Sequence, residues 1–222
     1  RTPSARKWTN EQKHAPMIEL HNIDCMQYLA TLDDNAFDLA IVDPPYGIGE
    51  GKKTIRTRKK HNNRIVHKNK DWDSSIPNKE YFKELKRVSK NQIIWGANYM
   101  VEHLPPSMGW IFWEKKIGGD FSDGELAYTS FNRALKMFTK WSGGNNKIHP
   151  TQKPIKLYEW LLMNYAKEGD KILDTHLGSG SIALACHNLG FELTACELDK
   201  EYYEAAMKRL KQHQLQLRIP ML

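Results

Sequence analysis

Short apolar segments alternate with helical patterns along this chain, and the alternation limits the folds that it can adopt. Seven segments are typical of strands because most are short, apolar and bounded by Asn, Gly, Asp or Pro. They are residues 17–20, 37–43, 92–95, 110–113, 134–139, 171–174 and 191–197. The main helical spacings cover residues 81–88, 155–165, 181–189 and 202–210. This order predicts an α/β fold with a largely parallel sheet and helices on both of its faces.

The length of 222 residues fits a single α/β domain. We expect residues 1–16 to be a flexible N-terminal arm, since they are polar and lack a signal-peptide core, and residues 17–222 to be the domain. No apolar run approaches the roughly 18 residues of a membrane span. Cys25, Cys186 and Cys196 form no CxxC pair, which favours reduced thiols and a cytoplasmic protein. The histidines show no metal-ligand spacing, so we expect no metal site.

A basic insert, residues 47–70, interrupts the alternation and favours a polyanionic partner. The whole chain carries a net charge of +7, and nine Lys or Arg residues without an acid lie between Gly51 and Lys70. A solvated, disordered loop is the alternative. The candidate DNA contacts are Lys52, Lys53, Arg56, Arg58, Lys59, Lys60 and Arg64.

The first candidate site, Asp43-Pro44-Pro45-Tyr46, stands at the end of a predicted strand. Two prolines fix φ and remove two N–H donors, so the Asp43 carboxylate and the Pro44 carbonyl can both act as outward-facing acceptors. Two acceptors suit an exocyclic amine, which has two N–H donors. Tyr46 offers a flat face for a base. A strand followed by a plain proline turn is the alternative.

A second candidate site follows the strand at residues 171–174. Asp174 precedes a turn that contains Gly178 and Gly180 and leads into a helix, an arrangement typical of nucleotide binding. Glu197 ends the next strand, where a carboxylate can bind ribose hydroxyls. The glycine spacing also fits a dinucleotide fingerprint. Asp174 would repel a pyrophosphate, however, and favours the amino-acid end of S-adenosylmethionine (SAM).

Two further segments carry candidate residues with plain structural alternatives. Thr151 can cap the helix at residues 155–165, and Lys153 could pair with a ligand carboxylate or lie in solvent. Asp24 follows the first strand. It could accept a hydrogen bond from an adenine amine, or it could be the N-cap of a helix over residues 25–32.

Together these motifs resemble the β-type amino-methyltransferases of DNA, which act on N6 of adenine or N4 of cytosine. The resemblance covers about residues 17–210, and its motif order matches: residues 43–46 first, then 149–154, then 174–180. It implies a Rossmann-like, seven-stranded, mostly parallel sheet of the class I SAM methyltransferases with a permuted motif order. Members are often dimers. The target-recognition region of such enzymes commonly precedes the His149-Pro150 motif, and here that interval is only residues 141–148. The resemblance therefore leaves three alternatives for DNA specificity: it is relaxed, it uses the basic insert, or it depends on a second subunit.

On the target side, the resemblance implies a catalytic motif made of Asp43, Pro44, Pro45 and Tyr46. Asp43 and the Pro44 carbonyl would hold the amine, and Tyr46 would stack on a flipped base. An acid at position 43 resembles the adenine-specific members, whereas Ser is typical of the cytosine-specific ones. The resemblance therefore implies an N6-adenine DNA methyltransferase, with N4-cytosine methylation as the alternative.

On the cofactor side, the resemblance implies SAM binding without a metal. Asp174 would face the amino group of SAM, Glu197 its ribose and Asp24 its adenine. Gly178 and Gly180 would form the loop around its amino-acid end, and Thr151 and Lys153 would bind near its carboxylate. His176 would lie at the floor of the pocket, where an aromatic is common in the family. The full set is Asp24, Thr151, Lys153, Asp174, His176, Gly178, Gly180 and Glu197. Two less favoured functions remain open: a nicotinamide-dependent oxidoreductase and a catalytically degenerate nucleic-acid-binding module.

Overall fold

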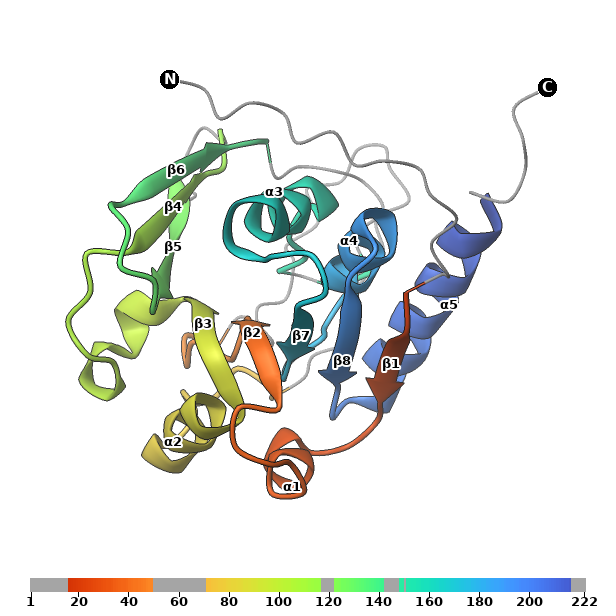
Figure 1. Cartoon of the computed structure of the whole chain (residues 1–222), viewed down its shortest axis with the longest axis horizontal. Helices are drawn as coiled ribbons and strands as arrows, with labels where there is room; N and C mark the ends of the chain where they lie inside the picture. The colour runs from red at the N-terminus through yellow and green to blue at the C-terminus, as the bar shows by residue number, and fades with distance from the viewer. Residues whose placement is uncertain (1–15, 50–70, 117–121, 142–147, 150, 217–222) are drawn as a thin grey trace, which may run out of the picture.

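A computed structural model describes residues 16–49, 71–116, 122–141, 148–149 and 151–216. One sheet runs in the order β1-β8-β7-β2-β3-β5-β4-β6, with helices on both faces (Figure 1). The strands are β1 (Ile18–His21), β2 (Phe37–Val42), β3 (Ser89–Trp95), β4 (Trp110–Glu114), β5 (Gly124–Thr129), β6 (Lys136–Thr139), β7 (Lys171–Asp174) and β8 (Glu192–Cys196). The helices are α1 (Cys25–Leu29), α2 (Lys79–Val88), η2 (Ala97–Tyr99), η3 (Val101–His103), α3 (Ile155–Tyr165), α4 (Ser181–Leu189) and α5 (Lys200–Gln216). The predicted α/β class is confirmed.

The sheet has eight strands where the sequence predicts seven. All neighbouring strands are parallel except β5, which runs antiparallel to both β3 and β4. The sequence analysis missed β5. Its first residues, Gly124 and Glu125, are a weak strand former and a charged residue, which leave too short an apolar alternation to detect. The prediction of a largely parallel sheet is otherwise correct.

Side chains of β2 alternate between two cores, one on each face of the sheet. Leu39 and Ile41 belong to the core that includes residues of α3 and α4, whereas Ala40 and Val42 belong to the core that includes residues of α2. All four are almost completely buried, which explains why the strand is a continuous apolar run. β2 is therefore held rigidly from both sides.

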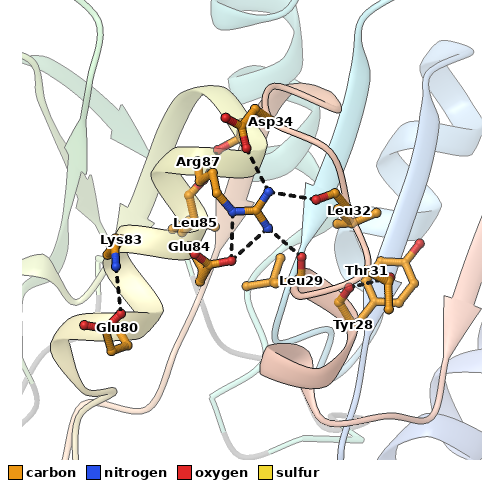
Figure 2. Close-up of polar contacts among 11 residues, drawn as sticks. Tyr28, Leu29, Thr31, Leu32, Asp34, Glu80, Lys83, Glu84, Leu85 and Arg87 are labelled. Atoms are coloured by element: carbon orange, nitrogen blue, oxygen red, sulfur yellow. Dashed lines mark hydrogen bonds and ion pairs between the residues drawn. The ribbon is translucent and has the colours of Figure 1, made fainter.

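Arg87 in the last turn of α2 links that helix to the end of α1 and to the segment between α1 and β2 (Figure 2). Its guanidinium donates to the carbonyls of Leu29 and Leu32 at 2.9 and 2.7 Å. It also pairs with Glu84 at 2.8 Å and Asp34 at 2.9 Å. A planar group with five donors can satisfy these acceptors together. The contacts fix how the chain enters β2.

The chain leaves β2 and β7 in opposite directions, although the two strands are parallel neighbours. Leu39 of β2 pairs with Ile172 of β7, and β2 continues to β3 on one side while β7 continues to β8 on the other. Such a switch point opens a crevice at the carboxyl ends of the strands. Both Asp43 and Asp174 stand at this edge. Within the described residues, no helix is long and apolar enough to cross a membrane.

Candidate active site

A cavity of about 330 Å³ occupies this crevice and joins the candidate motifs. Six separate segments of the chain contribute to its wall, because the sheet order brings the strand ends together. Of the candidate residues, the following line it: Asp24, Asp43, Pro44, Pro45, Tyr46, Thr151, Lys153, His176, Gly178 and Glu197. Asp174 and Gly180 are not among the residues that line it. Convergence of both candidate sites on one cavity allows two ligands to meet there.

Asp43 is the centre of a hydrogen-bonded cluster at one end of the cavity. Its Oδ1 accepts from the Tyr46 hydroxyl at 2.7 Å, and its Oδ2 lies 2.5 Å from Nζ of Lys153. Glu125 of β5 joins the cluster through Oε2, which lies 3.0 Å from the same Nζ and 3.2 Å from the Tyr46 hydroxyl. Lys115 adds a second ion pair to Glu125 at 2.6 Å. Two carboxylates and two ammonium groups therefore balance in charge.

Lys153 lies inside this cluster rather than at the cofactor side, where the resemblance places it. Its side chain is only 1% exposed. An ammonium has three N–H donors, and Asp43, Glu125 and Tyr46 offer Lys153 three acceptors. All three donors are thus engaged by the protein. The alternative of a lysine that lies in solvent is therefore wrong, and a contact of Lys153 with a ligand carboxylate stays a prediction.

The cluster separates the pKa values of its two carboxyl groups. Burial raises the pKa of Asp43, although Lys153 opposes the rise and Glu125 adds to it. Burial also works against ionisation of Glu125, but Lys153 and Lys115 outweigh it and lower its pKa to about 2. The two carboxylates overcome the effect of burial on Lys153 and raise its pKa. Glu125 and Lys153 therefore stay charged, and Asp43 is the more basic carboxylate.

Tyr46 is held in place by its neighbours as well as by its hydroxyl. Its ring stacks on Tyr99 with a centroid distance of 5.4 Å and an interplanar angle of 19°. Gly96 has a φ of +65°, and a Cβ there would lie 2.0 Å from Cε1 of Tyr46. Only glycine leaves room for the ring at this position. One aromatic partner, Tyr99, was not anticipated from the sequence.

Asp73 fixes the backbone of the first motif. Its Oδ1 accepts from the amides of Tyr46 and Gly47 at 2.6 and 2.9 Å, and its carbonyl accepts from Gly49 at 3.0 Å. The residue is 2% exposed and lines the cavity. Sequence reasoning missed it because no local pattern links it to a motif more than twenty residues earlier.

The two glycines of the turn after β7 have different surroundings: Gly178 lines the cavity and Gly180 packs against α5. Gly178, with a φ of +52°, lines the cavity and donates its amide to Glu197 at 2.8 Å. Gly180 instead faces α5, where an added Cβ would lie 3.0 Å from Cβ of Ala206. Gly180 therefore allows α4 and α5 to pack closely. The sequence did not indicate this packing role, and the predicted place of Gly180 in a loop around the ligand stays a prediction.

The carboxylates of Asp24 and Glu197, rather than the buried ionisable groups, give the cofactor side a negative character. Burial raises the pKa of Asp174 to about 8, so without a ligand this carboxyl is mostly protonated near pH 7. Burial lowers the pKa of His176 to about 4, so this ring is neutral near pH 7. Asp24 and Glu197 add carboxylates to the wall. A pyrophosphate would be repelled here, whereas a cationic ligand would be favoured.

Asp24 and Glu197 each combine a local backbone role with a place on the cavity wall. Asp24 is the N-cap of α1, since its Oδ1 accepts from the amides of Met26 and Gln27. The alternative of an N-cap is therefore correct for this residue. Oε1 of Glu197 accepts from the Asp199 amide at 2.9 Å. Because a carboxylate has about four acceptor positions, both residues retain capacity for a ligand.

Thr151 does not cap α3, contrary to the sequence prediction. Pro154 is the N-cap residue, and the Thr151 hydroxyl lies 3.1 Å from Nδ1 of His149. His149 also packs edge-on against Tyr202 at 4.4 Å and lies 5.0 Å from the ring of Trp72. Thr151 thus helps to orient one ring of an aromatic wall that the sequence did not indicate.

The basic candidates Lys52, Lys53, Arg56, Arg58, Lys59, Lys60 and Arg64 lie outside the described residues. Their role in DNA binding stays a prediction. Glu125 and Lys115 are charged members of the Asp43 cluster that sequence reasoning missed, as it missed Asp73. Neither belongs to a recognisable spacing, and only the pairing of β4 with β5 places them beside the first motif.

In the part of the chain that is described, no cluster of His, Cys, Asp or Glu could hold a metal ion.

Comparison with known proteins shows the family and the fold of this chain. A family model described as DNA methylase matches residues 94–208. The type II methyltransferase M.HpaI of Haemophilus parainfluenzae is 26% identical over 235 residues, which cover 84% of this chain and 72% of the relative. The structure of M1.HpyAVI with SAM has 21% identity and a TM-score of 0.57, covering 87% of this chain and 99% of the other. The cytosine-N4-specific PvuII DNA methyltransferase has 11% identity, the same TM-score and coverage of 91% and 93%. The two structural likenesses confirm the predicted fold.

Proposed function

Because this chain belongs to the DNA methylase family that modifies N6 or N4 amines, we propose that it methylates the N6 amine of a flipped adenine in DNA. Family membership makes it a SAM-dependent DNA amino-methyltransferase; the choice of adenine is the proposal. The observation that carries the proposal is the single cavity, about 330 Å³ in volume, that contains both Asp43 and the Gly178 turn. A methyl donor and an acceptor amine can meet only if both sites open into one space.

The residues of the cofactor side suit SAM, which supplies an electrophilic methyl group on a cationic sulfonium. The wall offers carboxylates to a positively charged ligand, and Lys153 is fully occupied within the protein. We propose that Glu197 binds the ribose hydroxyls, that Asp24 contacts the adenine ring, and that Asp174, whose raised pKa a nearby cation would lower, faces the ammonium group as a carboxylate.

On the target side, Asp43 and the Pro44 carbonyl are proposed to accept the two N–H groups of the adenine amine. The amine is a poor nucleophile because its lone pair is delocalised into the ring. Accepting both hydrogens favours a pyramidal nitrogen whose lone pair points at the methyl group. Each oxygen of Asp43 has two lone pairs, so the carboxylate can keep Tyr46 and Lys153 while it binds the amine. Asp43 is also the acceptor nearest to the departing proton.

Mass spectrometry of digested DNA tests the proposal directly. DNA incubated with the pure protein and labelled SAM should contain N6-methyladenine. The protein with Asp43 replaced by Ala is the control for a contaminating activity. The appearance of N4-methylcytosine without N6-methyladenine would show that the alternative, a cytosine enzyme like the PvuII protein, is correct.

Glu197→Ala should weaken SAM binding by about 2 kcal/mol, or roughly thirtyfold in the dissociation constant, because a charged acceptor for two hydroxyls is lost. Isothermal titration calorimetry measures the constant without DNA. Glu192→Ala is the matched control, since Glu192 is an exposed residue at the other end of β8. An unchanged constant in Glu197→Ala would refute the ribose role.

DNA is the partner that this function requires. The predicted homodimer or second specificity subunit remains a proposal, as does the use of the basic insert to hold the DNA backbone. Sedimentation with and without duplex DNA distinguishes a stable dimer from a monomer that binds alone.

A further inference from the structure

We propose that Glu125 is a positioning residue for methyl transfer, which acts on Asp43 through the ammonium of Lys153 that the two carboxylates share. The inference rests on the proposed function of Asp43 and extends it to β5, outside all the motifs that the sequence displays. Glu125 lines no part of the cavity. Any influence that it has on the reaction must therefore pass through its neighbours.

The ammonium group of Lys153 is shared by two carboxylates, Asp43 and Glu125. Its Nζ lies 2.5 Å from Oδ2 of Asp43 and 3.0 Å from Oε2 of Glu125. Because the side chain is 1% exposed, water cannot replace either partner. Strengthening one of the two ion pairs must weaken the other. Glu125 thus limits how strongly Lys153 can hold Asp43.

Lys115 competes with Lys153 for the carboxylate of Glu125. Its Nζ lies 2.6 Å from Oε1 of Glu125, on the oxygen that Lys153 does not use. The four charged groups form a chain in the order Lys115, Glu125, Lys153 and Asp43. Charges alternate along it, so removing one member changes the next in a direction that can be stated in advance.

The consequence for the reaction is that Asp43 remains basic enough to accept a proton. Were Lys153 paired with Asp43 alone, the carboxylate would be stabilised as an anion and would be a weaker base. Sharing the ammonium with Glu125 prevents this. Glu125 also contacts the Tyr46 hydroxyl at 3.2 Å, so it helps to orient the second group that touches Asp43.

Other ionisable groups around Asp43 must be considered in any titration. They come from every element packed against it: Tyr46 beside it, Tyr81 of α2, Lys115 after β4, Glu125 of β5, Lys153 before α3, Tyr158 of α3 and Asp174 of β7. The two variants below leave all of these unchanged except the residue replaced.

Glu125→Gln and Lys115→Gln should move the titration of Asp43 in opposite directions. Glu125→Gln frees Lys153 to pair with Asp43, so the pKa of Asp43 should fall by roughly one unit. In Lys115→Gln, Glu125 keeps only its ion pair with Lys153, which becomes stronger at the expense of the pair between Lys153 and Asp43. The pKa of Asp43 should therefore rise. Carbon-13 NMR of the carboxyl groups in the free protein measures both shifts. The Asp43 resonance is assigned as the one missing from Asp43→Asn.

In the dependence of kcat on pH, the acidic limb should shift in each variant in the same direction as the Asp43 pKa measured by NMR. Glu125→Gln should also lower kcat about tenfold, with little change in the KM for SAM. Glu159→Gln is the matched control. Glu159 is a buried, ion-paired glutamate on α3 whose partners are Lys156 and Asn188, away from the cavity. This control should leave both the titration of Asp43 and the profile unchanged.

Opposite shifts in the two variants support the inference, because a merely structural role would not change sign. Shifts in the same direction, or an unshifted Asp43 in Glu125→Gln, overturn it. If Glu125→Gln does not fold, Lys115→Gln tests the inference by itself: a rise in the Asp43 pKa supports it, and an unchanged or lower pKa overturns it. A wild-type protein that leaves DNA unmethylated would instead overturn the proposed function, whereas the NMR titration would still test the coupling.

Discussion

Asp43→Ala should lower the rate of methyl transfer by at least about a hundredfold, the usual scale for removing one positioned transition-state contact. The carboxylate lies at the target end of the cavity and accepts from Tyr46 and Lys153, so its loss removes an amine acceptor and disorganises the cluster. Single-turnover assays with labelled SAM measure the chemical step. The dissociation constant of SAM should stay close to the wild-type value, because Gly178 and Glu197 lie on the cofactor side.

Asp38→Ala provides the control for this prediction. Asp38 belongs to the same strand but lies at the opposite end from the cavity, where it pairs with Lys90. Its loss should leave the chemical step within a few-fold of wild type. Turnover of Asp43→Ala near the wild-type rate would remove Asp43 from the mechanism, even if the protein proved to be a methyltransferase.

Lys153→Met should lower the free energy of unfolding by about 3–5 kcal/mol, the usual cost of removing one partner from a buried ion pair. The variant leaves Asp43 and Glu125 close together with only Lys115 to offset them. Urea denaturation at pH 7 measures the change. Lys156→Met is the control, because Lys156 is a 69% exposed lysine of α3 and its pair with Glu159 should contribute at most about 1 kcal/mol.

The stability gap between wild type and Lys153→Met should narrow on acidification. Glu125 has a native pKa of about 2, below its usual value of 4.5. Its ion pair therefore stabilises the native state above pH 4.5 and is lost as the pH falls toward 2. In the variant, protonation removes the repulsion between two carboxylates. A gap that stays constant from pH 7 to pH 3 would contradict a role for this charge cluster in stability.

The fold could be predicted from the sequence because most of its elements carry their own signals. The continuous apolar run before Asp43 is typical of a strand buried on both faces, and β2 is such a strand. The helical period of α2 likewise placed Tyr81, Phe82, Leu85 and Val88 on a buried face. β5 carries no comparable signal. It was missed because its pairing with β3 and β4, rather than its composition, makes it a strand.

The candidate site could be predicted only in part, for the same reason. Asp43, Tyr46, Gly178 and Glu197 belong to local motifs at strand ends, and they line the cavity as the parallel topology requires. The predicted cap at Thr151 was wrong because a proline three residues later begins α3. Asp73 carries no motif at all, although its carboxylate fixes the backbone of Tyr46.

The sequence by itself determined the α/β class and the two motifs at strand ends. Periodicity, glycine and proline act locally, so they can be read along the chain. Only the tertiary structure decided which charges neutralise Asp43. Lys153 and Glu125 meet it because β5 enters the sheet between β3 and β4 and because the segment before α3 crosses the crevice. A buried ion pair depends on groups within a few ångströms in space, and distance along the chain does not specify them.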